Sequence, residues 1–361
     1  MPHSLDKPLL YITLVLFGGG LLILGSSSVA FSQKNFGTIS YYTLRHLAYG
    51  GIGIVGLLAG WRIPYRFWKK MAIPLMILSF VLLAAIFIPE ISYSWGGARR
   101  WLTFGGLSFQ PSELLKFSFI VYLAAWLEAR KKEVASIPYG VAPFVLMVGI
   151  IAIFLVMQPD IGTLGIIVGT AGVLYLLGGG RIPQMMALSG FGAILGYILI
   201  HLAPYRLHRM LVFLNPGLDP QGIGYQINQA FIAIGSGGFW GLGFGKSIQK
   251  YNYLPEPIND SIFAIFAEEM GFIGVLLLAA CFLFFFWRAL WIAKRAPDSF
   301  GTLLAAGIGT SITLQAFVNM AAISGLVPLT GIALPFVSYG GTTLAITLAS
   351  VGVLLNISKY T

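Results

Sequence analysis

The chain alternates long, continuously apolar segments with shorter polar connectors. Ten apolar runs can be distinguished, at Pro8–Ala30, Tyr42–Gly60, Met71–Pro89, Ser112–Glu128, Val141–Met157, Ile161–Leu177, Gln184–Leu202, Ser261–Trp287, Phe300–Ile323 and Thr342–Ile357. A helix needs roughly 17–25 apolar residues to cross a bilayer, and these runs lie in or near that range. Strands of a membrane barrel would alternate apolar and polar residues, which these runs do not. The pattern predicts an all-α membrane protein, a bundle of about ten transmembrane helices with a large extracytoplasmic loop between the seventh and the eighth.

Composition supports a membrane-embedded chain. Only 9% of the residues are charged and the mean hydropathy is +0.86, whereas soluble domains carry roughly 25% charged residues. The formal charge of +10 is typical of anchoring on the cytoplasmic side of a membrane and does not indicate nucleic-acid binding. The single cysteine, Cys281, has no partner for an internal disulfide. We expect one integral membrane domain over residues 1–361.

The basic residues predict how the chain is oriented. Clusters of Lys and Arg occur in the connectors 61–70, 130–132 and 288–295. All three fall on one side of the bundle, and basic connectors are typical of the cytoplasmic side. Both termini then lie in the cytoplasm, and the polar segments Ile91–Pro111 and Ala203–Asn259 lie on the outer face.

Two irregular segments indicate a cavity that opens outward. The large outer segment contains amphipathic pieces at 204–215 and 225–238, which predict short helices at the membrane surface. The connector 326–342 contains two prolines and a glycine pair. Such broken backbone is tolerated at membrane depth only where it is buried in protein or lines a cavity.

Asp260 is the first candidate for chemistry, because it stands where the outer loop ends and an apolar helix begins. One interpretation is a carboxylate that caps the helix by accepting hydrogen bonds from free backbone N–H groups. The other is a general base or cation ligand in a site partly screened from water. Burial would raise the pKa of this carboxyl, and the helix dipole would lower it. Position alone favours the cap, and both interpretations stay open.

Ionisable residues within apolar runs need a partner or a cavity, and four of them are further candidates. Glu268 shares a helical face with Asp260, and Glu269 points about 100° away. Their positions are equally compatible with a functional role and with a structural role in packing. Glu113 and Lys116 form an i, i+3 pair, for which we expect an internal ion pair. That pair can also line a cavity, where Lys116 could bind phosphate as a point charge.

Basic residues on the predicted outer face are further candidates for binding. They are Arg99, Arg100, Arg206, Arg209, Lys246 and Lys250. They fit either a solvated edge or a site for an anionic, membrane-anchored substrate such as a lipid diphosphate. The glycine run 241–245 does not follow a strand of a βαβ unit, so a nucleotide-binding loop is not indicated. The histidines are dispersed, and no zinc site is predicted.

Four segments resemble one bacterial family, the SEDS proteins, and the likeness runs over nearly the whole chain. They read FQPSELLKF, GYQINQAFIAIGSGGFWGLGFGKSIQKYNYLPEP, NDSIFAIFAEEMG and VPLTGIALPFVSYGGT. The family includes the cell-division and rod-shape (elongation) peptidoglycan polymerases and a sporulation member. The stretches GGARRWLTFGGLSFQPSE and GFGKSIQKYNYLPE look closer to the division subgroup, FtsW, than to the elongation subgroup, RodA.

The resemblance implies a glycosyltransferase that polymerises lipid II into β-1,4 glycan strands and releases undecaprenyl diphosphate on the outer face of the bacterial cytoplasmic membrane. It makes Asp260 the catalytic carboxylate, although Ile258-Asn259 stands where the family usually has His-Thr. The family's intramembrane Glu/Lys pair corresponds to Glu113 and Lys116, and its Glu-Glu pair to Glu268 and Glu269.

The implied mechanism uses Asp260 as a general base. Positive charge for the leaving diphosphate would come from Arg99, Arg100, Lys116 or a divalent cation such as Mg²⁺ or Mn²⁺. Lys246 is a further candidate for substrate binding. The partner implied by the family is a class B penicillin-binding protein, a transpeptidase. Metal dependence, the partner's identity and the choice between septal and lateral wall synthesis stay open.

Two other functions compete with polymerisation. A lipid II flippase suits the many spans, but transporters often show inverted repeats, and no internal symmetry is evident here. A non-catalytic scaffold that recruits a transpeptidase also fits the spans, but it leaves Asp260 without a task.

Overall fold

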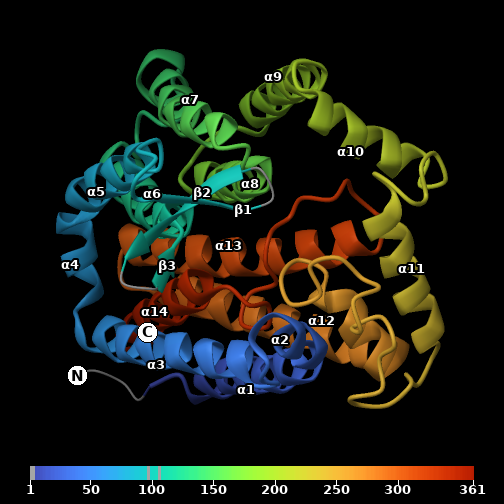
Figure 1. Ribbon diagram of the computed structural model, residues 1–361. Coiled ribbons are helices and arrows are strands. Elements are labelled where there is room, and N and C mark those ends of the chain that lie inside the picture. The colour runs from blue at the N-terminus through green and yellow to red at the C-terminus, as the bar shows by residue number, and fades with distance from the viewer. Residues whose placement is uncertain (1–4, 96–97, 105–106) are drawn as a thin grey trace.

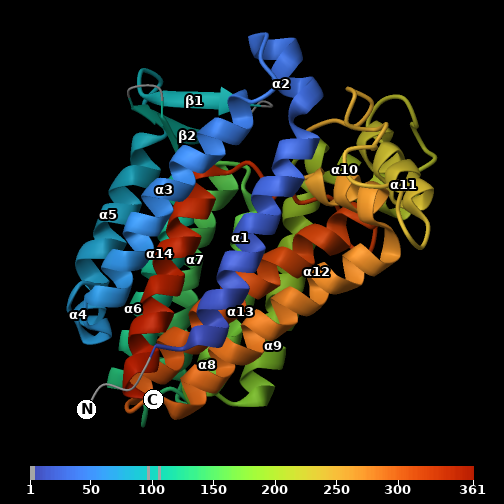
Figure 2. The ribbon, with the colours of Figure 1, turned by 90° about the horizontal axis from the view of Figure 1, so that it is seen from below.

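The computed structural model describes residues 5–95, 98–104 and 107–361. Figure 1 and Figure 2 show a bundle of helices in which α1 begins and α14 ends at the same end. The helices are α1 Lys7–Ser27, α2 Val29–Phe36, α3 Tyr41–Arg62, α4 Tyr65–Lys70, α5 Ala72–Ala85, α6 Pro111–Ala129, α7 Ala142–Met157, α8 Ile161–Leu177, α9 Ile182–His201, α10 Pro204–Leu214, α11 Tyr225–Gly237, α12 Ile262–Arg295, α13 Ser299–Ile323 and α14 Gly341–Ile357. A π-helical turn, η1 Ile137–Val141, precedes α7, and a 3-10 turn, η2 Ser358–Tyr360, follows α14.

A helix occupies each of the ten apolar runs. In the described part of the chain, six helical segments are long and apolar enough to cross a membrane: α1, η1 with α7, α9, α12, α13 and α14 with η2. Helices α3, α5, α6 and α8 fill the other four runs and are shorter or less apolar. The protein is a helical integral membrane protein, because a chain with this much continuous apolar surface can satisfy its backbone in lipid only as helices.

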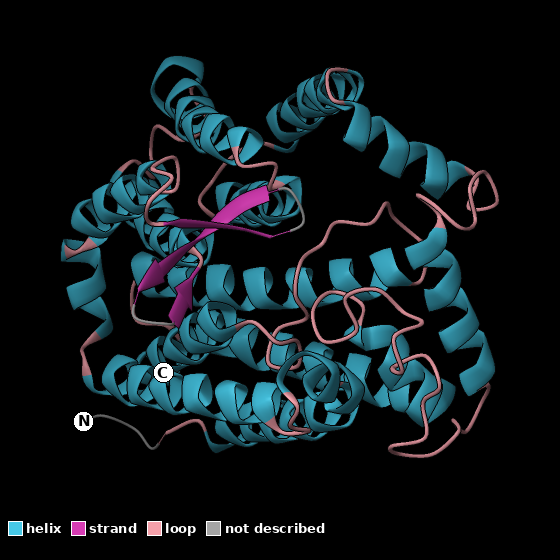
Figure 3. Cartoon of the chain, in the orientation of Figure 1, coloured by secondary structure: helices cyan, strands magenta, loops and turns pink. Residues whose placement is uncertain are grey.

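The end of the bundle opposite the termini carries the irregular segments. The predicted surface helices are present as α10 and α11, and Figure 2 places both at this end, near the start of α12. The segment 91–111, for which the sequence predicted no element, forms a small antiparallel sheet of β1 Ser92–Trp95, β2 Ala98–Phe104 and β3 Leu107–Phe109, coloured magenta in Figure 3. Its aromatic and Thr residues favour strands. The glycine pairs of its motif, 96–97 and 105–106, lie outside the described residues.

The sheet is fastened to the bundle through β3. The register pairs Tyr93 with Trp101 and Thr103 with Ser108. The backbone N–H of Ser108 donates to the Tyr49 hydroxyl of α3 at 3.1 Å, and the carbonyl of Ser108 accepts from the Thr342 hydroxyl of α14 at 3.2 Å. The sheet therefore lies over α3 and α14 at the end of the bundle opposite the termini.

Helices α3 and α14 pack with their backbones almost in contact. A methyl group on Gly60 of α3 would lie 2.7 Å from the carbonyl oxygen of Ala349. A methyl group on Gly352 of α14 would lie 2.2 Å from the carbonyl oxygen of Leu57. Small residues at helix interfaces permit this close approach in membrane proteins. The glycines of α3 therefore fix the position of α14 and of the connector that precedes it.

The variant Gly60→Ala should be destabilised, because its new methyl group meets backbone that cannot move aside. Overpacking of this kind costs about 1–3 kcal/mol. The matched control is Gly51→Ala in the same helix, where no atom lies within 4 Å of the added methyl group. That control should be neutral or stabilised by roughly 0.5–1 kcal/mol, since alanine is the better helix former. Thermal unfolding in detergent measures both, and equal shifts would contradict the packing.

Helix α12 is interrupted at Gly271, which has φ 63° and ψ −168°. The loop that follows α11 supplies partners for the backbone groups that lose their helical hydrogen bonds at this break. The carbonyls of Glu268 and Glu269 accept hydrogen bonds of 2.9 and 3.0 Å from amides of the segment 238–243, and the amides of residues 272–273 donate back to it. Unpaired backbone would be costly at this depth, so the loop and the break stabilise each other.

The side chains of the same two glutamates hold the next part of the loop. The Glu268 carboxylate accepts from the amides of Ile248 and Gln249 at 3.1 and 3.3 Å. The Glu269 carboxylate accepts from the Ser26 hydroxyl of α1 at 2.7 Å and from the Lys250 ammonium at 3.0 Å. Both glutamates and Lys250 are almost fully buried. The sequence left open whether Glu268 and Glu269 have a functional role or a packing role, and these contacts favour packing.

The variant Glu269→Ala should lose much of the protein's stability, because it leaves the buried Lys250 ammonium without its counter-ion. Breaking a buried pair costs about 3–5 kcal/mol. Glu133→Ala is the control, since it removes the exposed 2.8 Å pair with Arg130, and such pairs are worth about 0–1 kcal/mol. Melting temperatures compare the two variants. If Glu269→Ala melts with the wild type, the ion pair does not hold the loop.

Candidate active site

Asp260 lies in a turn between the long segment 203–259 and α12, against the connector 324–340. Three successive carbonyls, those of residues 258–260, accept hydrogen bonds from other segments. Their donors are the amide of Tyr339 at 2.8 Å, the hydroxyl of Ser338 at 2.6 Å and the side-chain amide of Asn319 at 2.9 Å. The backbone that carries Asp260 is therefore fixed by α13 and by the connector.

The Asp260 carboxylate faces α11 and does not cap α12. The side-chain amide of Gln226 on α11 lies 3.5 and 3.4 Å from its two oxygens, and the same amide donates to the Ser261 hydroxyl at 3.0 Å. The residue at the N-cap of α12 is Ser261, which makes no capping bond with its side chain. Long hydrogen bonds to a single amide leave the carboxylate oxygens available to a ligand.

Arg209 on α10 stands beside this carboxylate. Its Nη1 donates to the carbonyl of Leu329 in the connector at 3.1 Å. A methyl group on Gly331 would lie 3.9 Å from Oδ2 of Asp260 and 4.0 Å from Nη2 of Arg209. A carboxylate oxygen and a guanidinium nitrogen thus both lie next to the space beside Gly331, and a small polar group there could contact both.

The surroundings make Asp260 a weaker acid than usual. Burial raises the pKa of its carboxyl from 3.8 to about 6, and the negative charge of Glu256 adds to the rise, while Arg209 and Gln226 oppose it. The residue is only partly buried, so a ligand can still reach it. A carboxylate with a pKa close to neutral suits a general base, which must take up a proton and release it again.

Arg100 and Arg99 differ in their surroundings. The guanidinium of Arg100 donates to the carbonyl of Gln158 at 3.3 Å and also to that of Pro159, and so joins the sheet to the turn between α7 and α8. Burial lowers the pKa of Arg209, and Arg100 lowers it further by charge repulsion, so the two guanidinium groups are electrostatically coupled. Arg99 is exposed on β2. Of the two, Arg100 is the residue associated with the Asp260 site.

Glu113 and Lys116 form the ion pair that their spacing predicted, with 2.9 Å between Nζ and Oε2. Lys116 also donates to the side chain of Gln315, whose amide donates to the carbonyl of Ala333 at 2.9 Å. The pair therefore supports the connector two residues beyond Gly331. It also lines a small polar cavity with Ser311, Thr347 and Ser350.

The other sequence candidates lie apart from this arrangement. Glu268 and Glu269 hold the loop 238–250 and are saturated by protein donors. Lys246 is exposed in the same loop, next to Gly243. Among the described residues, no group of three or more His, Cys, Asp and Glu side chains could hold a metal ion.

Sequence reasoning did not single out Gln226, Asn319 or Glu256, and it noted Arg209 only as one of several outer basic residues. Gln226 and Arg209 lie 34 and 51 positions before Asp260 in the printed sequence, on separate amphipathic helices. Their polar side chains gave no sign of facing the carboxylate rather than solvent. Only the packing of α10 and α11 against the connector brings them together.

Comparisons with known proteins agree with this fold over the full chain. The family model for FtsW, RodA and SpoVE, described as a cell cycle protein, matches residues 7–361. The stage V sporulation protein E of Bacillus subtilis is 39% identical over 359 residues, which cover 99% of this chain and 98% of that protein. The probable peptidoglycan glycosyltransferase FtsW of Geobacter sp. is 40% identical over 354 residues, which cover 98% and 96%.

Solved structures show the same architecture. A chain from work on structural coordination of polymerization and crosslinking by a peptidoglycan synthase complex superposes with a TM-score of 0.82 at 27% identity, covering 99% of both chains. The rod shape determining protein RodA of Thermus thermophilus superposes with a TM-score of 0.73 at 25% identity, covering 98% of this chain and 97% of that one. The chain belongs to the FtsW/RodA/SpoVE family, the SEDS proteins.

Proposed function

We propose that this protein is a peptidoglycan glycosyltransferase that polymerises lipid II into β-1,4 glycan strands, for septal or lateral wall synthesis. Three relatives that are 38% to 40% identical bear the name probable peptidoglycan glycosyltransferase FtsW. The observation that carries the proposal is the Asp260 site. A carboxylate with a raised pKa, on backbone held by three hydrogen bonds, stands beside the guanidinium of Arg209.

In the proposed reaction, the acceptor is the GlcNAc 4-hydroxyl of lipid II. The donor is C1 of a MurNAc joined to undecaprenyl diphosphate. Asp260 takes the hydroxyl proton while the hydroxyl oxygen attacks C1. The bond from C1 to the diphosphate oxygen breaks, and its electron pair leaves with undecaprenyl diphosphate. Attack from the opposite face inverts an α-linked donor to a β-1,4 bond. A positioned base of this kind contributes typically about 10²–10⁴-fold to the rate.

The leaving diphosphate needs positive charge close to it, and the guanidinium of Arg209 is the best-placed cation. Its Nη2 borders the same space beside Gly331 as the Asp260 carboxylate. Arg100 adds positive charge nearby, since it is coupled electrostatically to Arg209. The exposed Arg99 and Lys246 are candidates for attracting the anionic substrate to the surface. Fixed cations at a developing negative charge need no reorganisation during the reaction.

The site offers carboxylates of the kind that hold a divalent cation such as Mg²⁺ or Mn²⁺. Mg²⁺ is commonly held by one or two carboxylates together with substrate phosphates. Asp260 and the neighbouring Glu256, whose charge acts on it, supply carboxylates of that kind. A bound cation would neutralise charge on the diphosphate.

The proposed topology places ten helices across the bacterial cytoplasmic membrane in one domain, residues 1–361. Both termini lie in the cytoplasm, and the segment 203–259, between the seventh and eighth spans, lies outside with Asp260. The basic connectors support this orientation. The position of α10 and α11 at the end of the bundle opposite the start of α1 supports it too (Figure 2).

The proposed partner is a class B penicillin-binding protein, which would crosslink the new glycan. The support is the similar chain from a peptidoglycan synthase complex in which polymerization and crosslinking are coordinated. Lipid II and the growing undecaprenyl-diphosphate-linked glycan are the other proposed ligands.

The variant Asp260→Asn should lose at least about 100-fold of the polymerisation rate, since it removes the base. It should nevertheless keep or raise the melting temperature at pH 7.5. The raised folded-state pKa of Asp260 means that the charged carboxylate opposes folding above that pKa, and asparagine is neutral. Gel analysis of glycan made from purified lipid II and thermal unfolding measure the two effects. Normal polymerisation by the folded variant would remove Asp260 from the mechanism.

The wild-type rate should fall as the pH drops through about 6, because the protonated Asp260 cannot accept a proton. The kcat/KM profile for lipid II measures this in the free enzyme. Gln226→Leu should move the acid limb to higher pH, since the amide of Gln226 favours the charged carboxylate. A profile without an acid limb between pH 5 and about 7 would contradict a base with this pKa.

A further inference from the structure

One buried side chain contacts both backbone segments that form the Asp260 site. The side-chain amide of Asn319, on α13, donates to the carbonyl of Asp260 at 2.9 Å and to the carbonyl of Ile332 at 2.8 Å. These two bonds use both donors of the amide group. Asn319 is 1% exposed, so water hardly competes for them. A single amide thus joins the backbone that carries the carboxylate to the connector.

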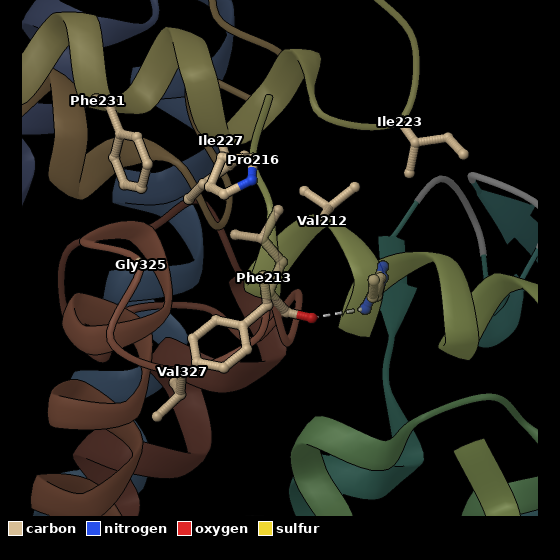
Figure 4. Close-up of a pocket in the computed structure, with 10 residues that line it drawn as sticks. Val212, Phe213, Pro216, Ile223, Ile227, Phe231, Gly325 and Val327 are labelled. Carbon is tan, nitrogen blue, oxygen red and sulfur yellow. Dashed lines mark hydrogen bonds between the residues drawn. The ribbon is translucent and has the colours of Figure 1, made fainter. Parts of the chain in front are cut away.

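The connector holds the guanidinium of Arg209 close to the same point. Arg209 donates to the carbonyl of Leu329 at 3.1 Å, and this bond is the dashed line in Figure 4. Gly331, two residues further along, lies next to both Nη2 of Arg209 and Oδ2 of Asp260. The bonds from Asn319 therefore fix the segment that anchors the guanidinium relative to the backbone of Asp260. The separation of the two charged groups depends on that relation.

Other helices pack closely against the connector. A methyl group on Gly162, at the start of α8, would lie 2.9 Å from the carbonyl oxygen of Thr330. Figure 4 shows Phe213 of α10 and Phe231 of α11 projecting toward the connector near Gly325. These contacts limit how far the connector can move. The bonds from α13 then determine where it meets the Asp260 backbone.

A purely structural role is the alternative, and the protein contains a matched example of one. Asn356 on α14 is also 1% exposed. Its side-chain amide donates to the carbonyl of Trp61 at 2.6 Å, and its Oδ1 accepts from the amide of Tyr65 at 2.8 Å. These bonds lie at the end of the bundle that carries the termini, far from Asp260. Asn356 is therefore a control for the loss of two buried bonds between a side chain and the backbone.

We infer that Asn319 is a positioning residue for the transfer reaction. Through the backbone, it fixes the Asp260 carboxylate relative to the Arg209 guanidinium. The inference rests on the proposed function, because a base and a cation that act in one step need a fixed separation. A misplacement of about 1 Å can cost on the order of 100-fold in rate. Loss of Asn319 should therefore slow the chemical step and leave the binding of lipid II nearly unchanged.

Steady-state kinetics of Asn319→Leu and Asn356→Leu test this role. Leucine has nearly the shape of asparagine and removes the hydrogen bonds in both variants, so both should melt below the wild type. We expect Asn319→Leu to lower kcat by about 10- to 100-fold and to change the KM for lipid II by less than about threefold. Asn356→Leu should keep the kcat and KM of the wild type. An equal loss of kcat in both variants, or a rise in KM alone in Asn319→Leu, would overturn the inference.

A milder variant keeps the test decisive if Asn319→Leu does not fold. Asn319→Ser is smaller and retains one hydroxyl donor, and the same split between kcat and KM is expected. A double-mutant cycle adds a readout that a structural role does not change. If Asn319 acts by placing Asp260, its substitution should add less than about threefold to the loss caused by Asp260→Asn. Losses that multiply would contradict positioning.

Hydrogen exchange tests the connection between the two segments without turnover. In Asn319→Leu or Asn319→Ser, amides of the segments 258–262 and 329–339 should exchange at least about tenfold faster than in the wild type. In Asn356→Leu they should exchange at the wild-type rate. Unchanged exchange in the Asn319 variants would overturn the connection.

The outcomes separate this inference from the proposed function. A wild-type protein that makes glycan, with an unchanged kcat in the Asn319 variants, refutes only the positioning role. A wild-type protein that makes no glycan refutes the proposed function and the catalytic part of the inference together. Hydrogen exchange then still decides whether Asn319 joins the two segments.

Discussion

The structure depends on hydrogen bonds that satisfy irregular backbone at one end of an apolar bundle, the end opposite the termini. Each unpaired amide or carbonyl there would cost several kcal/mol in a medium without water. The break in α12 at Gly271 and the loop 238–250 satisfy each other's backbone groups, and the buried Glu268 and Glu269 complete the network. The carbonyls of residues 258–260 are bound in the same way by the connector and α13.

This constraint has a chemical consequence. Because other hydrogen bonds hold the backbone of Asp260, its carboxylate is not needed to hold the loop, and its contacts with the Gln226 side chain are long. A poorly satisfied, partly buried carboxylate has a raised pKa. The same connector that fixes Asp260 also anchors Arg209 through Leu329. One frame thus holds a carboxylate and a guanidinium next to the same space beside Gly331.

Features that follow from the spacing of apolar and polar residues could be predicted from the sequence, and contacts between residues far apart in the chain could not. Apolar runs predicted the positions of helices in the bundle, and amphipathic spacing predicted α10 and α11, because both depend on burial alone. The pair of Glu113 and Lys116 was predictable because both residues lie on one helical turn. The small sheet in the segment 91–111 and the break at Gly271 were not foreseen, since each depends on distant partners. For the same reason the sequence could not decide whether Glu268 and Glu269 line a cavity or hold a loop.

The most direct test of the account is whether this protein makes glycan from purified lipid II. Purified wild-type protein would be reconstituted with lipid II and a partner transpeptidase whose active site is inactivated, so that the glycan strands are not crosslinked. Gel analysis of the products would be combined with a fluorescence assay of lipid II movement between leaflets. The account predicts glycan strands and no acceleration of that movement. Accelerated movement without any strands, from folded protein with its partner bound, would contradict it.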